Sequence, residues 1–368
     1  MEESDALMAL NLLEGIGPVT VRRLLESFGS AASSLGAPID RLKQVRGVGP
    51  EMAEKLHGWK SRVDVAAEAE RVRRFGCQVV TAVDEVYPAR LRDLYDPPIC
   101  LYYRGNLDCL RSTCVALVGS RQTTAYGMSV ARKLGYQLAQ LGVTVVSGGA
   151  RGIDTAAHEG ALAGGGQTAV VLGHGIDRVF PAENVGLFKR AAEQGIVLTQ
   201  FPFNRKAGRQ TFPVRNRIVA GISLGTVVIE ANLTSGALIT ANMAADIGRQ
   251  VFAVPGRVDS PRSKGCHQLL RNGAALCESV EDIRNEFESL FPSGQDVGDQ
   301  SEEKIGTEPE MDDEMAQVWR VLTLEEKHQD LIAAETGLPA SKVSTSLLRL
   351  ELQRVIIQSP GKLFRRAQ

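Results

Sequence analysis

Short apolar runs alternate with amphipathic stretches through the middle of the chain. Runs near 115–118, 143–147, 168–172, 196–199, 225–230 and 250–254 predict strands. Between the first two, Val130, Leu134, Leu138 and Leu141 recur at intervals of four and three, the spacing of one helical face. Strands that alternate with such helices predict an α/β domain whose parallel sheet is covered on both faces.

Two glycine-rich turns follow the first two predicted strands. Gly119, Ser120 and Arg121 follow the first strand, and residues 147–154 (Ser-Gly-Gly-Ala-Arg-Gly-Ile-Asp) follow the second. In a Rossmann-like parallel sheet such turns lie together at the carboxyl edge, where open α/β folds hold their ligands. Backbone N–H groups at a helix start, beside an arginine, favour an anion and above all a phosphate.

The known nucleotide fingerprints are missing from these turns. Residues 119–121 do not continue as G-x-G-x-x-G, no acidic residue closes a second strand at the expected distance, and the G-x-x-x-x-G-K-[ST] loop is absent. NAD and ATP are therefore disfavoured, and we expect no cofactor.

A basic stretch follows in the same domain, because residues 194–229 hold no acidic residue. Its positive charges are Arg205, Lys206, Arg209, Arg215 and Arg217. Beside two amide-rich turns, these cations predict a positive pocket. The alternative is that individual arginines brace the fold through ion pairs with Asp154, Asp177 or Glu230.

Other titratable residues near the turns have simpler explanations. Asp154 suits a helix N-cap better than a catalytic acid. His158, one turn into that helix, suits a structural role better than that of a general base, and His174 stands alone in a loop. We therefore predict no catalytic residue and no metal ligand.

An internal repeat marks the N-terminal part of the chain. Residues 13–18 (Leu-Glu-Gly-Ile-Gly-Pro) recur as 45–50 (Val-Arg-Gly-Val-Gly-Pro), and each copy lies between two helical patterns. Residues 1–62 therefore resemble a tandem helix-hairpin-helix domain, in which the Gly-x-Gly turn brings amides to a DNA phosphate without reading sequence. The alternative is a hairpin pair that only packs or dimerises.

The remaining domains follow from changes in composition. Residues 63–290 carry the predicted sheet, preceded by a helix and two strand candidates that we expect to pack onto it as an extension. Residues 291–313 are acidic and poor in apolar positions, which predicts a flexible linker. In residues 314–368, three helical patterns and a hairpin predict a winged helix. Its third helix carries Lys342, Arg349 and Glu351, so DNA contact and protein or dimer contact both stay open.

The net charge of −1 conceals a basic folded part, because residues 285–314 carry eleven acidic residues and one lysine. Without that segment 41 basic and 32 acidic residues remain, an excess that suits a polyanionic partner. The six cysteines form no C-x-x-C pair, no apolar run reaches 18 residues, and the first five residues are not basic. We expect a cytoplasmic protein without disulfides, structural zinc or a membrane span.

Several motifs, in order, resemble the DprA/Smf family of bacterial DNA-processing proteins. They are G-S-R at 119–121, S-G-G-A-R-G-I-D at 147–154, F-P-x-x-N at 180–184, F-P-x-R-N-R-I at 212–218, S-G-A-L-I-T-A at 235–241 and F-A-V-P-G at 252–256. The resemblance spans essentially the whole chain. It departs at Ala182, where some relatives carry a lysine, and at His267, where asparagine is usual.

This resemblance implies a non-catalytic homodimer that binds single-stranded DNA in the positive pocket. It also implies that the protein loads RecA recombinase onto incoming strands during natural transformation, in competition with single-strand binding protein. The family's dimer and RecA contacts correspond loosely to 265–282. The candidate DNA-binding residues are Gly119, Ser120, Arg121, Ser147, Gly148, Gly149, Arg151, Gly152, Lys206, Arg209, Arg215, Asn216 and Arg217.

Two further points bear on the site. Aromatic residues form only 5% of the chain, and the nearest candidates for base stacking, Phe180 and Tyr126, suit the core at least as well.

The rival hypothesis is an enzyme. Residues 225–230 (Gly-Thr-Val-Val-Ile-Glu) faintly resemble a Rossmann-like nucleoside monophosphate phosphoribohydrolase, in which a glutamate and an arginine cleave an N-glycosidic bond.

Overall fold

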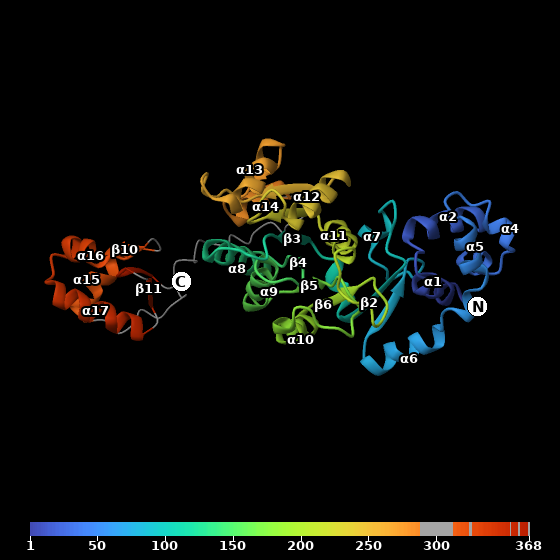
Figure 1. The fold of residues 1–368 in the computed structure, drawn as a ribbon, viewed down its shortest axis with the longest axis horizontal. Coiled ribbons are helices and arrows are strands. Elements are labelled where there is room, and N and C mark those ends of the chain that lie inside the picture. Colours follow the sequence, from blue (N-terminus) through green and yellow to red (C-terminus); the bar gives the residue numbers. More distant parts are fainter. Residues whose placement is uncertain (288–311, 324–325, 354, 360, 367–368) are drawn as a thin grey trace. The chain divides into compact units, whose positions relative to one another are not determined.

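The computed structural model describes residues 1–287, 312–323, 326–353, 355–359 and 361–366 (Figure 1). The chain divides into two compact units, Met1–Gln295 and Asp296–Gln368. Most of the predicted acidic linker lies outside the described residues. No helix in the described part of the chain is both long and apolar enough to cross a membrane.

A nine-stranded sheet forms the centre of the first unit, in the order β1-β2-β6-β5-β4-β3-β7-β8-β9. Neighbouring strands from β6 to β9 along this order are parallel, whereas β1 and β2 join as antiparallel strands. The strands are β1 (Gln78–Thr81), β2 (Cys100–Gly105), β3 (Cys114–Val118), β4 (Thr144–Gly148), β5 (Thr168–Val171), β6 (Ile196–Thr199), β7 (Gly225–Val228), β8 (Gln250–Ala253) and β9 (Ala275–Leu276). The six strands expected from the apolar runs are confirmed as β3 to β8. Strands β1 and β2 extend the sheet itself, and β9 was not predicted.

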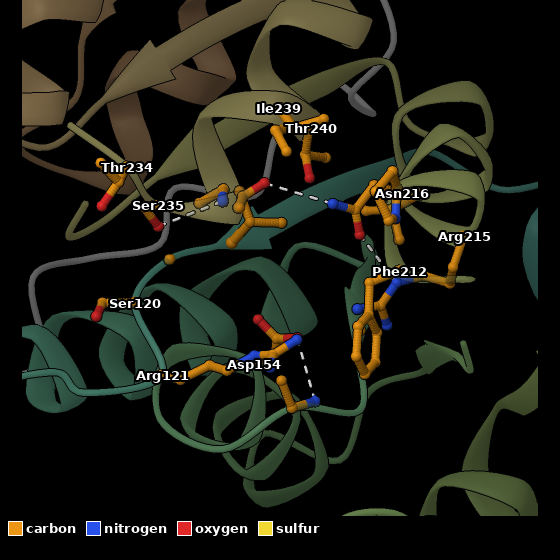
Figure 2. A pocket seen from close by; sticks show the side chains of 18 of the residues that line it. Ser120, Arg121, Asp154, Phe212, Arg215, Asn216, Thr234, Ser235, Ile239 and Thr240 are labelled. Carbon is orange, nitrogen blue, oxygen red and sulfur yellow. Dashed lines mark hydrogen bonds between the residues drawn. The ribbon is translucent and has the colours of Figure 1, made fainter. Parts of the chain in front are cut away.

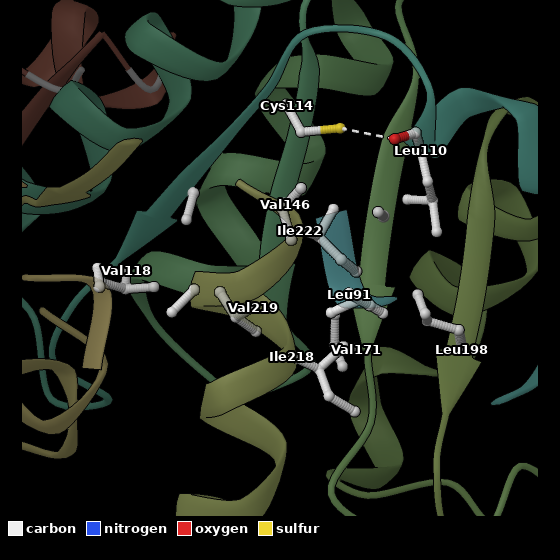
Figure 3. Close-up of a cluster of buried hydrophobic side chains, with 14 of the residues drawn as sticks. Leu91, Leu110, Cys114, Val118, Val146, Val171, Leu198, Ile218, Val219 and Ile222 are labelled. Carbon is white, nitrogen blue, oxygen red and sulfur yellow. Dashed lines mark hydrogen bonds between the residues drawn. The ribbon is translucent and has the colours of Figure 1, made fainter. Parts of the chain in front are cut away.

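Helices cover both faces of this sheet. They are α7 (Ala89–Arg92), α8 (Ala125–Gln140), α9 (Ile153–Ala163), α10 (Val185–Gln194), α11 (Thr211–Ile222), α12 (Gly236–Asp246), α13 (Lys264–Arg271) and α14 (Val280–Glu286). On one face, Ile218 and Val219 of α11 pack in a buried cluster with Val171 of β5 (Figure 3). On the other face, Leu162 of α9 and Phe188 of α10 pack with strand residues. Each fully buried side chain of this kind contributes roughly 1.5–3 kcal/mol.

The direction of chain growth reverses beside β3. After β3 the chain adds β4, β5 and β6 on one side and then returns to add β7 on the other. Ligands of open α/β sheets bind at such a switch point, outside the carboxyl ends of the strands. The turns that follow β3, β4 and β7 therefore meet where a ligand is expected.

The N-terminal repeat forms two equivalent hairpins. Gly15 and Gly47 have positive φ angles of 88° and 84°, and Gly17 and Gly49 are the N-caps of the helices that follow. The helices are α1 (Glu3–Leu12), α2 (Pro18–Phe28), α3 (Ala31–Leu35), α4 (Ile39–Leu42), α5 (Pro50–His57) and α6 (Val65–Phe75). They share a buried cluster with residues of β2, including Tyr102, so this part belongs to the first compact unit.

The second unit is a winged helix, as predicted. Its elements are α15 (Asp313–Val321), β10 (Lys327–His328), α16 (Gln329–Thr336), α17 (Ala340–Leu352), β11 (Ile356–Ser359) and β12 (Leu363–Arg366). Val318, Ile332, Leu347 and Phe364 form its core. Strand β10, which the sequence did not predict, pairs with β12.

Candidate nucleic-acid interface

A cavity of about 490 Å³ opens at the switch point (Figure 2). Its walls come from the turns after β3 and β4, from α11 and from the start of α12. The polar side chains that line it include those of Arg121, Asp154, Arg209, Arg215, Asn216 and Thr234. Four separate segments of the sequence thus meet around one open space.

Glycines allow the two turns to touch. The amide of Ile153 donates to the carbonyl of Ser120 across 3.3 Å. Gly152 has a φ of +80°, and a Cβ there would lie 2.5 Å from the same carbonyl oxygen. A Cβ on Gly119 would lie 2.5 Å from the Ile153 side chain. The turns therefore interlock, and this contact positions Arg121 at the cavity.

Several amides that the turns were expected to offer to an anion are engaged inside the protein. The amide of Ser120 donates to the carbonyl of Glu230 at 2.7 Å, and that of Gln122 to the Ser120 hydroxyl at 3.1 Å. The amide of Ala150 donates to the Asp154 carboxylate at 3.2 Å. The contribution expected from main-chain donors is therefore reduced, and the arginine side chains carry most of the positive character.

Arg121 presents its charge to the cavity. Its guanidinium carbon lies 4.5 Å from the centre of the Phe212 ring, a cation–π arrangement that holds the group in place (Figure 2). The side chain is exposed and forms no ion pair with any residue that the structure describes. Its N–H groups are thus available to an incoming anion.

Arg215 forms a buried part of the cavity wall. It is 5% exposed, its Nη1 donates to the carbonyl of Val171, and its Nε donates to Asn216 at 3.0 Å. A Cβ on Gly148 would lie 2.1 Å from Nη1, so glycine at this position makes room for the guanidinium. Burial raises the pKa of Asp154, and the positive charge of Arg215 opposes this rise. Because both groups are buried, the positive charge of Arg215 and the negative charge of Asp154 compensate each other.

Three of the other predicted residues, Gly149, Arg151 and Lys206, lie beside the cavity. Gly149 and Arg151 line a smaller recess of about 70 Å³ that shares Arg121 and Arg215 with it. Arg151 also binds Glu183, with 3.0 Å between Nη2 and Oε2, and this pairing lowers the pKa of Glu183 to about 2.

Lys206 lies in an open groove of about 570 Å³, together with Arg205 and Arg209. Arg209 also lines the cavity, so the groove continues from it. None of these three cations is ion-paired within the described ranges.

The remaining three predicted residues line neither the cavity nor the two spaces beside it. The hydroxyl of Ser147 donates to the carbonyl of Leu117 at 2.6 Å inside the fold, and Gly152 packs against the first turn. Arg217 forms a partly buried ion pair with Asp96. The alternative of a bracing role thus describes Arg217, although its partner is Asp96 and not Asp154, Asp177 or Glu230.

The structure adds residues to the site that the sequence did not single out. Asn232, Thr234, Ser235 and Thr240 line the cavity from the β7–α12 side. The side chain of Ser235 caps α12 by accepting from the amide of Ala237 at 3.3 Å. A polar run directly after the predicted strand at 225–230 was the available signal, because this strand adjoins the switch point.

The acidic and histidine residues near the cavity have structural partners. The Glu230 carboxylate is buried and accepts from both hydroxyls and one amide of Thr123 and Thr124, at 2.6 to 2.8 Å. It therefore organises the start of α8. Asp154 lies in the first turn of α9, after the N-cap, which is Gly152. Among the described residues, no three His, Cys, Asp or Glu side chains are grouped to hold a metal ion.

His158 is fully buried beneath the second turn. Its Nε2 donates to the carbonyl of Gly148 at 2.8 Å, and its Nδ1 lies 2.6 Å from the hydroxyl of Thr168. These partners assign the proton of the neutral ring to Nε2. Burial lowers the pKa of His158 to about 4, so the neutral ring supports the cavity wall.

The chain is similar to known proteins along almost all of its length. The model of the DNA recombination-mediator protein A family matches residues 78–288, the SAM-like helix-hairpin-helix tandem matches 7–58, and the DprA winged helix domain matches 302–362. Protein Smf of Synechocystis sp. is 32% identical over 98% of both chains. The chain belongs to the DprA/Smf family.

Proteins from other bacteria support the same family membership. DNA processing protein DprA of Streptococcus pneumoniae is 42% identical over 56% of this chain and 73% of its own. An X-ray structure of that protein aligns with a TM-score of 0.69 and 31% identity, covering 80% of this chain and 100% of the other. A structure of DNA processing protein A from Helicobacter pylori, described for its single-stranded DNA binding mode, aligns with a TM-score of 0.53 and 28% identity over 58% of this chain and 98% of the other. The family membership and the three-part architecture expected from the motifs are thus confirmed.

Proposed function

We propose that the protein binds single-stranded DNA without sequence preference in the switch-point cavity. One observation carries the proposal: the guanidinium of Arg121 lies over Phe212, without an ion pair in the described structure, beside the buried charge of Arg215. The exposed charge of Arg121 in an open cavity suits a phosphate of a flexible strand, and Arg209, which lines the same cavity without an ion pair among the described residues, suits the next one.

The groove beside the cavity gives the strand a path. Arg209 lines both spaces, and Arg205 and Lys206 follow it in the groove. In this arrangement the phosphates lie along the cations, and most bases project outward. The Helicobacter pylori relative, whose structure concerns single-stranded DNA binding, supports this assignment.

The proposal extends to the cellular role. Bound strands are protected and passed to RecA recombinase in competition with single-strand binding protein, in the cytoplasm and during natural transformation, without catalysis by the protein itself. The description of the family as recombination mediators supports this role. The buried contacts of Glu230 give the rival glycosidic-bond chemistry no support. The proposed role is tested by RecA-dependent strand exchange on DNA coated with single-strand binding protein. If the protein does not stimulate this exchange, the role is contradicted.

We include a homodimer in the proposal. The segment assigned to dimer contacts holds α13, β9 and α14, and β9 is the last strand of the sheet. Leu276 of β9 is 47% exposed, which supports a contact at this edge. Sedimentation of the full chain should give a dimer, and Leu276→Arg should shift it toward monomer. A monomeric parent protein would refute this part.

The binding experiment compares single- and double-stranded DNA of equal length across a salt series. Arg121→Ala should weaken binding of the single strand by roughly 1–3 kcal/mol and reduce the salt slope by about 0.7. Arg111→Ala is the matched control, because Arg111 is an exposed arginine that precedes β3 at the opposite edge of the sheet. Equal losses in the two variants, or tighter binding of the duplex, would refute the assignment.

A further inference from the structure

Phe180 presents an aromatic ring to solvent at the edge of the cavity. It is 51% exposed, so a large part of the ring is open to solvent. It lines the recess of about 70 Å³ together with Pro181, Phe212 and Arg121. The ring centres of Phe180 and Phe212 lie 6.4 Å apart, and their planes are tilted by 37°. Two aromatic rings and a guanidinium thus surround one small opening.

The loop that carries Phe180 is fixed to the sheet edge. Asn184 is 4% exposed and donates from Nδ2 to the carbonyl of Gly149 at 3.1 Å and to the hydroxyl of Thr155 at 3.0 Å. His174 is also buried, and its Nε2 lies 3.4 Å from the carbonyl of Phe180. The exposed ring is therefore held in place before any ligand arrives, which lowers the entropy cost of binding.

We infer that Phe180 is a stacking platform for one nucleobase of the bound strand, a subsite that rests on the proposed function. The recess shares Arg121, Ala150, Phe212 and Arg215 with the phosphate cavity, so a base and its own phosphate reach the two spaces together. The recess is open to solvent at Phe180, so a base can reach the ring there. The base therefore lies against the exposed face of Phe180.

The subsite takes any base. Stacking depends on the π-face that all four bases share, and such contacts contribute to affinity without reading sequence. The recess thus complements the arginines, which recognise only the phosphates. The ring of Phe180 acts on the base and the arginines act on the backbone, so the two contributions to affinity can be measured separately.

The experiment measures binding of the full chain to oligo(dT) and to an oligomer of abasic deoxyribose phosphates of equal length and at equal salt. Phe180→Ala should weaken binding of oligo(dT) about fivefold or more and leave the abasic oligomer unchanged. Phe180→Leu, which keeps apolar volume against Phe212, should show the same loss, and Phe180→Tyr should restore the affinity. Tyr126→Ala is the control, because Tyr126 is a 50% exposed aromatic residue that lines neither space.

The outcomes separate the subsite from the proposed function. Unchanged oligo(dT) binding by Phe180→Ala, or equal losses on both probes, would overturn the stacking inference. Arg121→Ala should weaken both probes equally. If it weakens neither, the phosphate cavity itself is wrongly assigned, and the inference falls with it.

Discussion

Cations lie at two places where DNA contact was considered, the switch-point cavity and α17 of the winged helix. In the cavity, Arg121 and Arg209 have no acidic partner in the part of the chain that the structure describes. On α17, Lys342 forms an ion pair with Glu314, and Arg349 forms one with Asp312 at 2.8 Å. Both acids belong to the start of α15, where Asp312 is the N-cap.

The difference shows that the number of cations is a poor guide to nucleic-acid contact. A cation that already forms an ion pair with a carboxylate of its own domain must lose that partner before it binds a phosphate, whereas Arg121 forms no ion pair among the described residues. The comparison favours the cavity as the DNA site and favours a protein contact for the winged helix, which stays a prediction.

The largest effect is expected when the buried charge of Arg215 is removed from the cavity wall. Arg215→Ala should lower the free energy of unfolding by about 3 kcal/mol, because it leaves Asp154 buried without its opposite charge. Adding Asp154→Asn should recover part of this loss. Urea unfolding of the full chain measures both effects. A double variant less stable than Arg215→Ala alone would show that the two charges do not compensate each other.

The second effect depends on pH. The pKa of His158 falls from 6.5 to about 4 in the folded protein, so the unfolded chain binds a proton that the folded chain does not between these values. Stability of the first unit should therefore fall by about 2 kcal/mol as the pH drops from about 7 to about 5, and level off near the folded pKa.

The two tryptophans provide the readout. Trp59 belongs to the first unit and Trp319 to the winged helix, so Trp319→Phe leaves fluorescence that reports on the first unit alone. Replacing His158 by Gln should remove most of the pH dependence there. The same pH dependence in a protein with His158→Gln would exclude His158 as its origin.

The third effect comes from making a cavity cation more available. Glu183 binds Arg151 at the edge of the recess. The side chain of Glu183 is 50% exposed and that of Arg151 is 66% exposed. Glu183→Gln should tighten single-stranded DNA binding by about threefold and steepen its salt dependence, because it removes a negative charge and leaves Arg151 to a phosphate. Glu159→Gln, which removes the partner of Arg132 on α8, is the matched control. Weaker binding after Glu183→Gln would contradict this role.

The fourth and smallest effect belongs to the winged helix. Replacing both Lys342 and Arg349 by Ala should change the affinity for oligo(dT) by less than about twofold, because both cations already have acidic partners. The same binding assay measures it. A loss as large as that of Arg121→Ala would make α17 part of the DNA site. It would contradict the difference between the cavity and α17.

Much of the fold could be predicted because its signals are local. Apolar runs identified β3 to β8, and the repeated Gly-x-Gly-Pro motif identified both hairpins, since a positive φ and a helix start require those residues. Strand β9 has two residues and no periodicity, so nothing in the sequence marked it. Strands β1 and β2 were found, but the antiparallel pairing of β2 with β6 depends on contacts across almost a hundred residues.

The site could be predicted only in part, because side-chain partners are set by tertiary structure. Arg121, Arg209 and Arg215 line the cavity as their positions after strands and in the basic stretch suggested. Arg217 lies two residues from Arg215 on the same helix, yet it points to Asp96, which is 121 positions away in sequence. The exposure of Phe180 likewise depends on how its loop is anchored.

The most direct test of the cavity as the DNA site is photocrosslinking of an oligo(dT) that carries 4-thiothymidine to the full chain, followed by peptide mapping. We predict crosslinked peptides from the turn after β3, from the segment that contains Arg209 and Phe212, and from the loop of Phe180. Crosslinks confined to the winged helix or to the N-terminal hairpins would contradict the account.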